Sequence, residues 1–463
     1  MTAATIPLLL TLACGAGRPN FVVMMTDDQR YDKFSHMGDP LLKTPNLDRL
    51  RSEGMGFRRM YVTNSLCAPS RATLLTGLYS HAHGVTDNKD RRLDPKLPIL
   101  PELLREAGYD AAFCGKSHIG GALRDRQWEY YFGFKGQGNY LKPVIAEGTD
   151  GKDLPRQGYM DDVVTDKAIN WLTRRNQEKP FILFLFFKAP HRSWQRAPRH
   201  MHLYEGTTVP KPATWDDPGV GKPRSFLEAD NRIGVFDDAK DYDAMVKDYN
   251  ATITAVDENV GRVLATLDDL KLTDSTNVFF TSDNGFFLGE WQRFDKRFMH
   301  EVSSRVPMIV RGPGIAANST NERIILNADI APTILDLAGV KPKAAMHGRS
   351  FAPLLHGQTP ADWRKDWLYE YYEYPGPHSV RANRGVATER YKYIHYYTNP
   401  VEYELYDLQS DPEERKNLTD DPQYADIRKQ LAARLEELRK ETGDTYGDAN
   451  PAELKAKAKG KPK

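Results

Sequence analysis

Short apolar runs alternate with helix-like patterns through most of this 463-residue chain. Residues 21–25, 181–187 and 277–280 are apolar runs of strand length, whereas residues 44–50 and 243–270 carry apolar positions at helical spacing. Apolar strands that alternate with helices are typical of a parallel sheet buried on both faces. The pattern therefore predicts an α/β fold with a large, mostly parallel sheet sandwiched by helices.

The pattern changes after about residue 346. Tyr and Trp become frequent, and residues 385–397 alternate like exposed antiparallel strands. A helix-like stretch then places four apolar residues on one face: Ile427, Leu431, Leu435 and Leu438. We therefore expect a main domain over residues 18–346, a small C-terminal α+β subdomain over 347–450 and a disordered, Lys-rich tail over 451–463.

The N-terminus carries a short apolar run, residues 5–13, followed by small residues. It resembles the core of a secretory signal, and residues 12–15 are similar to a lipoprotein cleavage site. We therefore expect a signal segment over residues 1–17 and an exported protein, periplasmic or secreted, with a lipid anchor on Cys14 as one variant. Because no basic residue precedes the run, a frayed cytoplasmic N-terminus is the alternative. No other apolar run approaches membrane length, so no integral membrane span is expected.

The charge balance and the cysteine content argue against a nucleic-acid-binding protein and against a disulfide-stabilised one. Lys plus Arg number 64 and Asp plus Glu number 63, so no broad basic surface for nucleic acid is expected. The three cysteines, Cys14, Cys67 and Cys114, are too few for a disulfide framework. Cys114 lies inside a predicted strand and is interpreted as a core residue.

Acidic side chains follow two of the predicted strands directly. Asp27 and Asp28 come after the strand at residues 21–25, and Asp283 and Asn284 come after residues 277–280. Taken singly, such residues are usually turns or helix caps. At the carboxyl ends of neighbouring strands they would share one cleft, where only a bound cation would balance their charge. Oxygen ligands favour Ca²⁺, with Mg²⁺ as the alternative, over zinc.

Residues 67–77, with the sequence Cys-Ala-Pro-Ser-Arg-Ala-Thr-Leu-Leu-Thr-Gly, place a reactive group at the start of a predicted helix. The free N–H groups and the dipole of a helix N-terminus suit an anion, and Arg71 adds a fork of donors for a tetrahedral oxyanion. A buried cysteine before an ordinary helix is the alternative interpretation. Read alone, the stretch predicts Cys67 beside an anion site.

Four basic residues follow other predicted strands or loops: Lys116, His118, His191 and Lys296. A single Lys or His in a loop is usually a solvated surface residue. Together with Arg71 these residues would supply positive charge for an anionic substrate. The long, aperiodic stretch 192–240 is expected to form a surface excursion near them and to take part in substrate selection.

Residues 67–77 resemble the signature of the type I sulfatases, a family of the alkaline-phosphatase-like superfamily. The segment 115–118 is similar to the family's Gly-Lys-x-His, residues 189–191 to the segment with its third-loop histidine, and residues 295–298 to the segment with its last lysine. Ser117 departs from the Trp that many relatives carry. The resemblance extends from residue 19 to about residue 450, and it implies an alkaline-phosphatase-like fold for a sulfuric ester hydrolase.

The resemblance also implies the chemistry. In this family a maturation enzyme oxidises the cysteine to Cα-formylglycine, and a hydroxyl of the hydrated aldehyde attacks sulfur. Applied to this chain, Cys67 would be that residue and would complete a metal site formed by Asp27, Asp28, Asp283 and Asn284. The sulfate ester would face the metal, Lys116, His191 and Lys296, while Arg71 helps hold the attacking hydroxyl. Asp283 would accept its proton, His191 or Lys296 would protonate the leaving alcohol, and His118 would promote sulfate release.

Residues 77–88, 371–381 and 385–390 resemble carbohydrate sulfatases, most closely the bacterial N-acetylglucosamine-6-sulfatase and mucin-desulfating group. The implied substrate is 6-O-sulfated N-acetylglucosamine or a related sulfated carbohydrate. His378 and Arg381 would be candidate sugar contacts, with surface turn residues as the alternative.

Three alternatives stay open at this stage. An arylsulfatase would share every motif described above. A phosphatase or phosphonate monoester hydrolase of the same superfamily would use the same metal and basic residues. A non-catalytic glycan-binding protein is expected if Cys67 remains a thiol.

Overall fold

We describe the protein from a computed structural model, for residues 17–89, 93–119 and 123–446. A large mixed sheet forms its centre, with the strand order β11-β2-β12-β8-β1-β7-β3-β4-β5-β6 and β13 paired to β2. These strands are β1 (Asn20–Thr26), β2 (Met55–Tyr61), β3 (Asp110–Lys116), β4 (Tyr130–Phe134), β5 (Val144–Glu147), β6 (Asp153–Pro155), β7 (Phe181–Phe186), β8 (Thr276–Ser282), β11 (Arg305–Val306), β12 (Met308–Arg311) and β13 (Ser319–Leu326).

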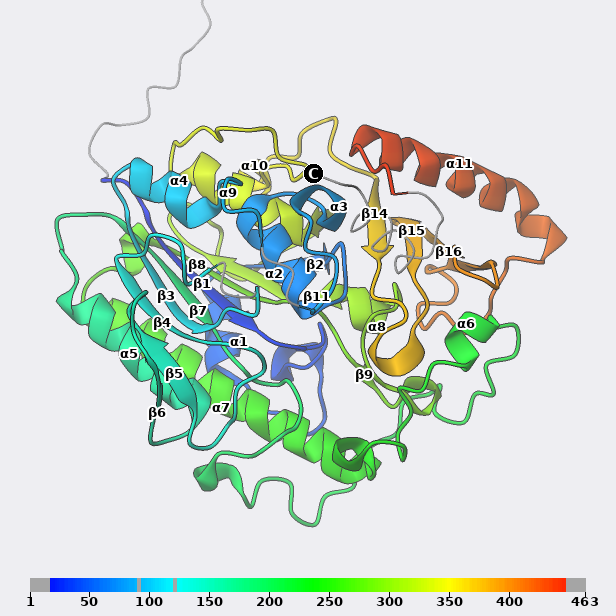
Figure 1. Cartoon of the computed structure of the whole chain (residues 1–463), viewed down its shortest axis with the longest axis horizontal. Helices are drawn as coiled ribbons and strands as arrows, with labels where there is room; N and C mark the ends of the chain where they lie inside the picture. Colours follow the sequence, from blue (N-terminus) through cyan, green and yellow to red (C-terminus); the bar gives the residue numbers. More distant parts are fainter. Residues whose placement is uncertain (1–16, 90–92, 120–122, 447–463) are drawn as a thin grey trace, which may run out of the picture.

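Helices cover both faces of this sheet (Figure 1). Side chains alternate along β1, so that Phe21 and Val23 enter the core on one face and Val22 and Met24 enter the core on the other. Helices α2 (Cys67–Thr76), α4 (Leu100–Glu106), α9 (Ile330–Leu337) and α10 (Ala352–Leu355) pack on the first face. Helices α1 (Pro45–Ser52), α5 (Met160–Arg174) and α7 (Tyr242–Asp269) pack on the second. This arrangement confirms the predicted α/β sandwich.

The sheet is parallel at its centre and antiparallel near both ends. Strand β1 pairs in parallel with β7 and β8, and β7 pairs in parallel with β3. Strand β12 runs antiparallel to both β8 and β2, and β5 runs antiparallel to β4. Because β1, β3, β7 and β8 point the same way, the polar residues after their carboxyl ends meet at one edge.

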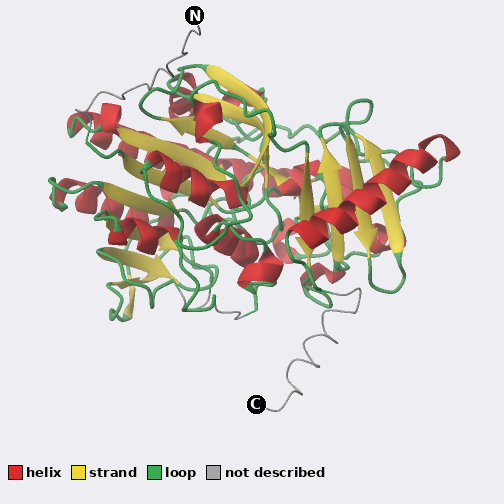
Figure 2. Ribbon diagram, turned by 90° about the horizontal axis from the view of Figure 1, so that it is seen from above, coloured by secondary structure: helices red, strands yellow, loops and turns green. Residues whose placement is uncertain are grey.

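A second, four-stranded antiparallel sheet lies beside the first, with α11 (Ala425–Glu441) across it (Figure 2). Its strands are β14 (Asp366–Tyr371), β15 (Asn383–Thr388), β16 (Tyr391–Tyr396) and β17 (Glu402–Asp407). The sequence pattern predicted exposed strands, but the burial pattern of β15 and β14 is mostly buried. The reason is that Leu431 and Leu435 of α11 belong to the same apolar core as Tyr61 of the large sheet, whose ring stacks on Trp367 at 4.8 Å.

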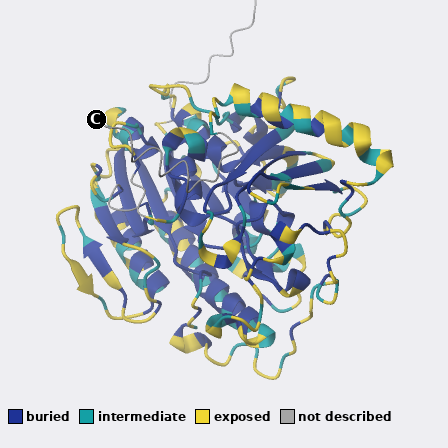
Figure 3. Cartoon of the chain, turned by 45° about the vertical axis from the view of Figure 1, so that its right-hand side comes forward, coloured by how far each residue is buried: buried dark blue, intermediate teal, exposed yellow. Residues whose placement is uncertain are grey.

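The remaining α-helices and strands are short. They are α3 (Ser80–His83), α6 (Arg224–Leu227), α8 (Glu301–Ser304) and the hairpin β9 (Phe287–Leu288) and β10 (Phe294–Asp295). Figure 3 shows most strands of the large sheet buried, whereas the edge strand β6 and the outer turns of α11 are exposed. None of the helices among the described residues has the length and apolar character that crossing a bilayer requires. Residues 1–16 of the expected signal segment (1–17) and the whole of the expected tail (451–463) lie outside the described residues.

Gly115 in β3 is held where no side chain fits. Its φ is +117°, and a Cβ at this position would lie 1.8 Å from the carbonyl oxygen of Phe186 in β7. We predict that Gly115→Ala lowers the free energy of unfolding by about 3 kcal/mol, because it combines backbone strain with a clash in the sheet. The matched control is Gly136→Ala, where φ is +60° and no atom lies within 4 Å, so the cost is about 1 kcal/mol. Urea denaturation measures both, and equal losses would contradict the packing argument.

His81 in α3 forms a buried ion pair with the small antiparallel sheet. Its Nδ1 lies 2.7 Å from Glu370 of β14, and its Nε2 lies 2.9 Å from the carbonyl oxygen of Thr442, which follows α11. Burial alone would lower the pKa of His81, but Glu370 outweighs it and raises the pKa from 6.5 to about 9. Both ring nitrogens face acceptors, which only the charged imidazolium satisfies.

Because the folded-state pKa exceeds the unfolded one, this pair stabilises the fold fully below about pH 6.5, and the stabilisation is lost as pH rises through 9. We predict that between pH 6.5 and 9.5 the free energy of unfolding of the parent protein falls by about 3 kcal/mol more than that of His81→Gln. Urea denaturation at the two pH values tests this prediction. Equal pH dependence of the two proteins would show that His81 carries no charge in the fold.

Candidate active site

Donor side chains from three elements converge at the carboxyl edge of the large sheet. Asp27 and Asp28 follow β1, Cys67 begins α2, and His191 follows β7; ligand atoms of all four lie within 4.8 Å of one another. Asp283 and Asn284 follow β8, the neighbour of β1. The Asp28 backbone N–H donates to Asp283 at 3.1 Å, and the Asn284 amide donates to Asp28 Oδ1 at 2.6 Å.

The oxygens of this cluster suit a cation. Asp27, Asp28, Asp283 and Asn284 are all fully buried. Two of their oxygens, Asp28 Oδ2 and Asn284 Oδ1, are buried without a hydrogen-bond partner among the described residues. A buried oxygen without a hydrogen bond destabilises the fold unless a cation or another polar group contacts it. Oxygen donors of this kind fit Ca²⁺ or Mg²⁺.

The carboxyl groups respond differently to their surroundings. Burial raises the pKa of Asp27, but Lys116, His191 and Arg71 outweigh burial and hold this pKa well below its usual range. Burial raises the pKa of Asp28 despite Lys296, and burial with the neighbouring Asp27 raises the pKa of Asp283 to about 7. Crowded carboxylates therefore repel one another wherever a basic group does not compensate.

Cys67 is the first residue of α2 and is completely buried. Its Sγ lies 3.4 Å from Asp27 Oδ1 and 3.4 Å from the Lys296 ammonium. Burial, together with Asp27, raises the pKa of the thiol in spite of Lys296. A protonated, buried thiol is a poor nucleophile, although the residue is placed at the centre of the candidate site.

Arg71 lies one turn along α2 and differs from expectation. The sequence predicted a fork of donors open to an oxyanion. In the structure its Nε donates to Asp283 at 2.9 Å and its Nη1 donates to the Lys116 carbonyl at 2.5 Å, with the side chain fully buried. Asp283 and the end of β3 therefore occupy Nε and Nη1, and Arg71 links these two groups. Its Nη2 lies 2.8 Å from Asp283 but forms no hydrogen bond among the described residues.

The other four basic residues lie around the same cluster. The ammonium groups of Lys116 and Lys296 form buried ion pairs with Asp27 and Asp28 respectively. His191 Nε2 lies 3.8 Å from Asp28 Oδ2. Burial and the nearby Lys116 lower the pKa of His118 and of His191 well below the usual value, so both rings are neutral at pH 7.

A cavity of about 720 Å³ opens over this cluster. His118, His191 and Lys296 line it, and Arg192, Phe236, Asp237 and Asp238 bring the excursion 192–240 to its wall. This placement agrees with the expectation that the excursion lies near the site. The lining residues that were not singled out from the sequence include Gln137, Lys188, Arg192, Asp295, Arg297 and Glu373.

Backbone strain marks the same place. Five non-glycine residues in or beside the cluster and cavity have positive φ: Asp28 (74°), His118 (50°), Asp295 (77°), Arg297 (88°) and His378 (66°). Such conformations are unusual for these residue types and gather at functional sites. Asp295 and Arg297 flank Lys296 in the sequence, and that proximity was the only sequence signal for them.

The two predicted sugar contacts are placed differently. His378 is buried beside the cavity, with Nε2 at 3.4 Å from Asp295 Oδ2 and 3.0 Å from a nitrogen of Arg192. Arg381 does not line the cavity. It pairs with Glu228 at 3.2 Å and donates to the Asn399 carbonyl at 2.5 Å.

Comparison with known proteins agrees with this geometry. Residues 19–340 match the family model described as Sulfatase, and residues 289–441 match the model described as N-sulphoglucosamine sulphohydrolase, C-terminal. An N-acetylglucosamine-6-O-sulfatase of Bacteroides thetaiotaomicron is 38% identical over 94% of this chain and 88% of its own. The human N-acetylglucosamine-6-sulfatase is 30% identical over 78% of this chain and 68% of its own.

Among solved structures, a protein in complex with its substrate D-glucosamine-2-N,6-O-disulfate superimposes with a TM-score of 0.89. It is 37% identical, and the match covers 93% of this chain and 99% of that one. The family model covers well over half of the chain, and two relatives reach 30% identity across more than two thirds of it. The chain therefore belongs to the sulfatase family and is a sulfuric ester hydrolase with the alkaline-phosphatase-like fold.

Proposed function

We propose that this sulfatase hydrolyses the 6-O-sulfate of N-acetylglucosamine or of a closely related sulfated glycan. The observation that carries the proposal is the placement of the Cys67 sulfur between Asp27 and Lys296, whose side chain lines an open cavity. The substrate follows from the relatives, which are N-acetylglucosamine-6-sulfatases and a protein bound to a 6-O-sulfated glucosamine.

We infer that Asp27, Asp28, Asp283 and Asn284, together with an oxygen on residue 67, hold Ca²⁺, with Mg²⁺ as the alternative. The orphaned oxygens of Asp28 and Asn284 support this assignment. When bound, the cation would draw charge from a sulfate oxygen and stabilise the charge that develops as the ester bond breaks. The buried carboxylates would in turn lose much of their mutual repulsion.

Cys67 would act after conversion to Cα-formylglycine by a formylglycine-generating enzyme of the host. The buried, protonated thiol supports this view, because it would be a poor nucleophile as it stands. Such a partner must reach residue 67 before the chain folds, since Cys67 is fully buried in the folded protein.

The chain's own residues would manage charge and protons. Lys116 and Lys296 would neutralise sulfate oxygens, and Asp283 would accept the proton of the attacking hydroxyl. Lys296, which is charged at pH 7, or His191, whose neutral ring would first have to take up a proton, would protonate the leaving alcohol. His118 would remove the proton that allows sulfate to leave. The neutral state of the His118 ring at pH 7 suits a proton acceptor.

Sugar recognition would fall to residues that line the cavity beside Lys296. Asp295, Arg297 and Glu373 line the cavity, and Arg297 lies 3.2 Å from Asp295 and 2.9 Å from Glu373. Carboxylate and guanidinium groups held together in this way can accept from and donate to neighbouring sugar hydroxyls. His378 would orient Asp295, whereas Arg381 would act from outside the cavity.

A phosphatase or phosphonate monoester hydrolase activity is the second candidate, because the same lysines would also bind phosphate. The family and the sugar-sulfatase relatives favour sulfate. We also propose that the protein is exported, on the basis of the apolar run at residues 5–13.

The first test is sulfate release from N-acetylglucosamine-6-sulfate by the full chain co-produced with a formylglycine-generating enzyme. Cys67→Ala should lower the rate by at least about 10³-fold, because it removes the attacking group. Cys114→Ala, at the other free cysteine among the described residues, should keep activity. Peptide mass across residue 67 reports the conversion to the aldehyde.

Several outcomes would contradict the proposal. Hydrolysis of glucosamine-6-phosphate without hydrolysis of the sulfate ester would favour the phosphatase. No release from the amino sugar by protein with a confirmed aldehyde would reject this substrate and direct the assay to aryl sulfates and other sulfated glycans.

Metal removal provides an independent prediction. Calcium at about 100 times its Kd should raise the free energy of unfolding of chelator-treated protein by about 2.7 kcal/mol, since only the folded chain assembles the oxygens. Asp28→Asn should abolish most of this gain. Asp257→Asn is the matched control, because this buried carboxylate caps the N-terminus of α1 instead and should leave the gain unchanged. An equal calcium effect in both variants would place the cation elsewhere.

A further inference from the structure

Lys188 is a buried charge that none of the roles above uses. It follows β7 and is only 2% exposed. Its ammonium forms no hydrogen bond and no ion pair with any of the described residues. The ammonium lies over the ring of Tyr140, whose centroid is 4.4 Å from Nζ. A buried ammonium without an anionic partner is unfavourable, so its position requires an explanation.

The neighbouring carboxylate, Asp161, does not explain the buried charge of Lys188. Asp161, in the first turn of α5, is fully buried, but its Oδ1 accepts from the backbone N–H of Lys188 at 2.8 Å. It thereby fixes the backbone that leads to His191, and it lies beyond ion-pair distance of the Lys188 ammonium. Asp161 therefore positions the start of this loop without neutralising the side chain.

Lys188 instead lines the catalytic cavity. His118, His191, Lys296 and Gln137 line the same space, and Gln137 accepts from the ammonium of Lys116. Burial and the charge of Lys116 lower the pKa of Lys188 to about 8, which leaves it mostly charged at pH 7. Four carboxylates also line the cavity, and the other charged basic residues of the lining are paired: Arg192 with Asp238, Lys296 with Asp28 and Arg297 with Glu373. Lys188 has no such pair, so its charge favours an anion inside the cavity.

We propose that Lys188 is a substrate-binding residue whose ammonium donates a hydrogen bond to a non-bridging oxygen of the sulfate ester in this cavity. The inference rests on the proposed function. It adds a third lysine to Lys116 and Lys296, which the sequence motifs identify. Lys188 differs from those two because no carboxylate holds it, so its full charge is available to the substrate.

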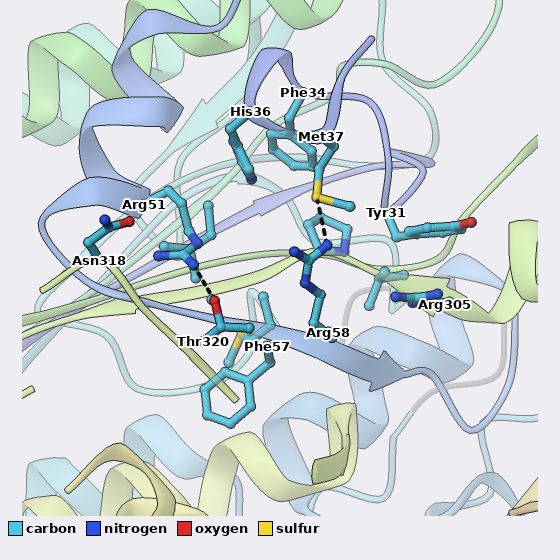
Figure 4. A pocket seen from close by; sticks show the side chains of 15 residues that line it. Tyr31, Phe34, His36, Met37, Arg51, Phe57, Arg58, Arg305, Asn318 and Thr320 are labelled. Carbon is cyan, nitrogen blue, oxygen red and sulfur yellow. Dashed lines mark hydrogen bonds between the residues drawn. The ribbon is translucent and has the colours of Figure 1, made fainter. Parts of the chain in front are cut away.

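A second cavity could also attract sulfate and must be controlled for. Its volume is about 210 Å³, and it is lined by Arg51, Arg58 and Arg305 (Figure 4), with no carboxylate among its lining residues. Arg51 donates there to Thr320, and burial together with Arg58 lowers its pKa. None of its lining residues lines the catalytic cavity. Arg51→Met therefore removes one positive charge from the competing site only.

The experiment compares Lys188→Met, Lys188→Arg and Arg51→Met with the parent chain. Calorimetry measures the Kd of inorganic sulfate for each full-length protein with Cys67 unconverted and calcium present. Kinetics of the matured proteins with N-acetylglucosamine-6-sulfate give kcat and KM, and thermal unfolding verifies that each variant is folded.

We expect Lys188→Met to weaken sulfate binding and to raise KM by at least about 10-fold, which is typical of a lost charged hydrogen bond. Because ester and transition state both carry the oxygen that Lys188 contacts, kcat should change much less than KM. Lys188→Arg should retain most of the affinity, and Arg51→Met should retain KM. If Lys188→Met does not fold, the comparison of Lys188→Arg with a Lys188→Gln variant provides the same test.

The proposal is overturned if Lys188→Met binds sulfate and substrate as the parent does, or if only Arg51→Met loses sulfate. It is also overturned if Lys188→Met affects D-glucosamine-2-N,6-O-disulfate but not the monosulfate, since Lys188 would then contact a second sulfate group. Should the parent release no sulfate from any ester, the proposed function fails, and the sulfate Kd values still decide the position of Lys188.

Discussion

The crowding of carboxylates at the edge of the large sheet is the constraint on which the rest of the site depends. Asp27 and Asp28 end β1, and Asp283 ends β8, its direct neighbour in the sheet. All three are fully buried, where unpaired negative charges are strongly unfavourable. The surrounding lysines, Arg71 and the proposed cation are the groups that make this arrangement compatible with a folded chain.

The scaffold that carries this charge is rigid where the chemistry requires it. Parallel strands buried on both faces fix the ends of β1, β3, β7 and β8, and each of these ends supplies one part of the site. Helix α2 sets the distance between Cys67 and Arg71, and Arg71 in turn ties Asp283 to the end of β3. Groups that must act together are thus linked to one another through a few buried side chains.

The wall of the cavity comes from loops outside the large sheet. The excursion 192–240 and the loop before β15 border the space above the carboxylate cluster. His378 of that loop lies between Asp295 and Arg192, so the two segments meet at one point. In our proposal, residues at the carboxyl edge of the large sheet catalyse hydrolysis of the sulfate ester, and residues of these loops determine which sugar binds.

The sequence by itself determined the layered α/β fold, the strands that are followed directly by polar residues of the candidate site, and the residues of the sulfatase motif. It could do so because strand and helix periodicity are local, and because carboxyl ends of parallel strands share one edge. Only the tertiary structure decided which of these residues contact one another and which of them lie at the cavity. It showed Arg71 occupied by Asp283, Arg381 outside the cavity, and both faces of the small sheet covered. It also revealed Lys188, whose ammonium is buried without a carboxylate partner although no sequence pattern marks this residue. Such pairings depend on contacts between residues far apart in the chain, and no local pattern encodes them.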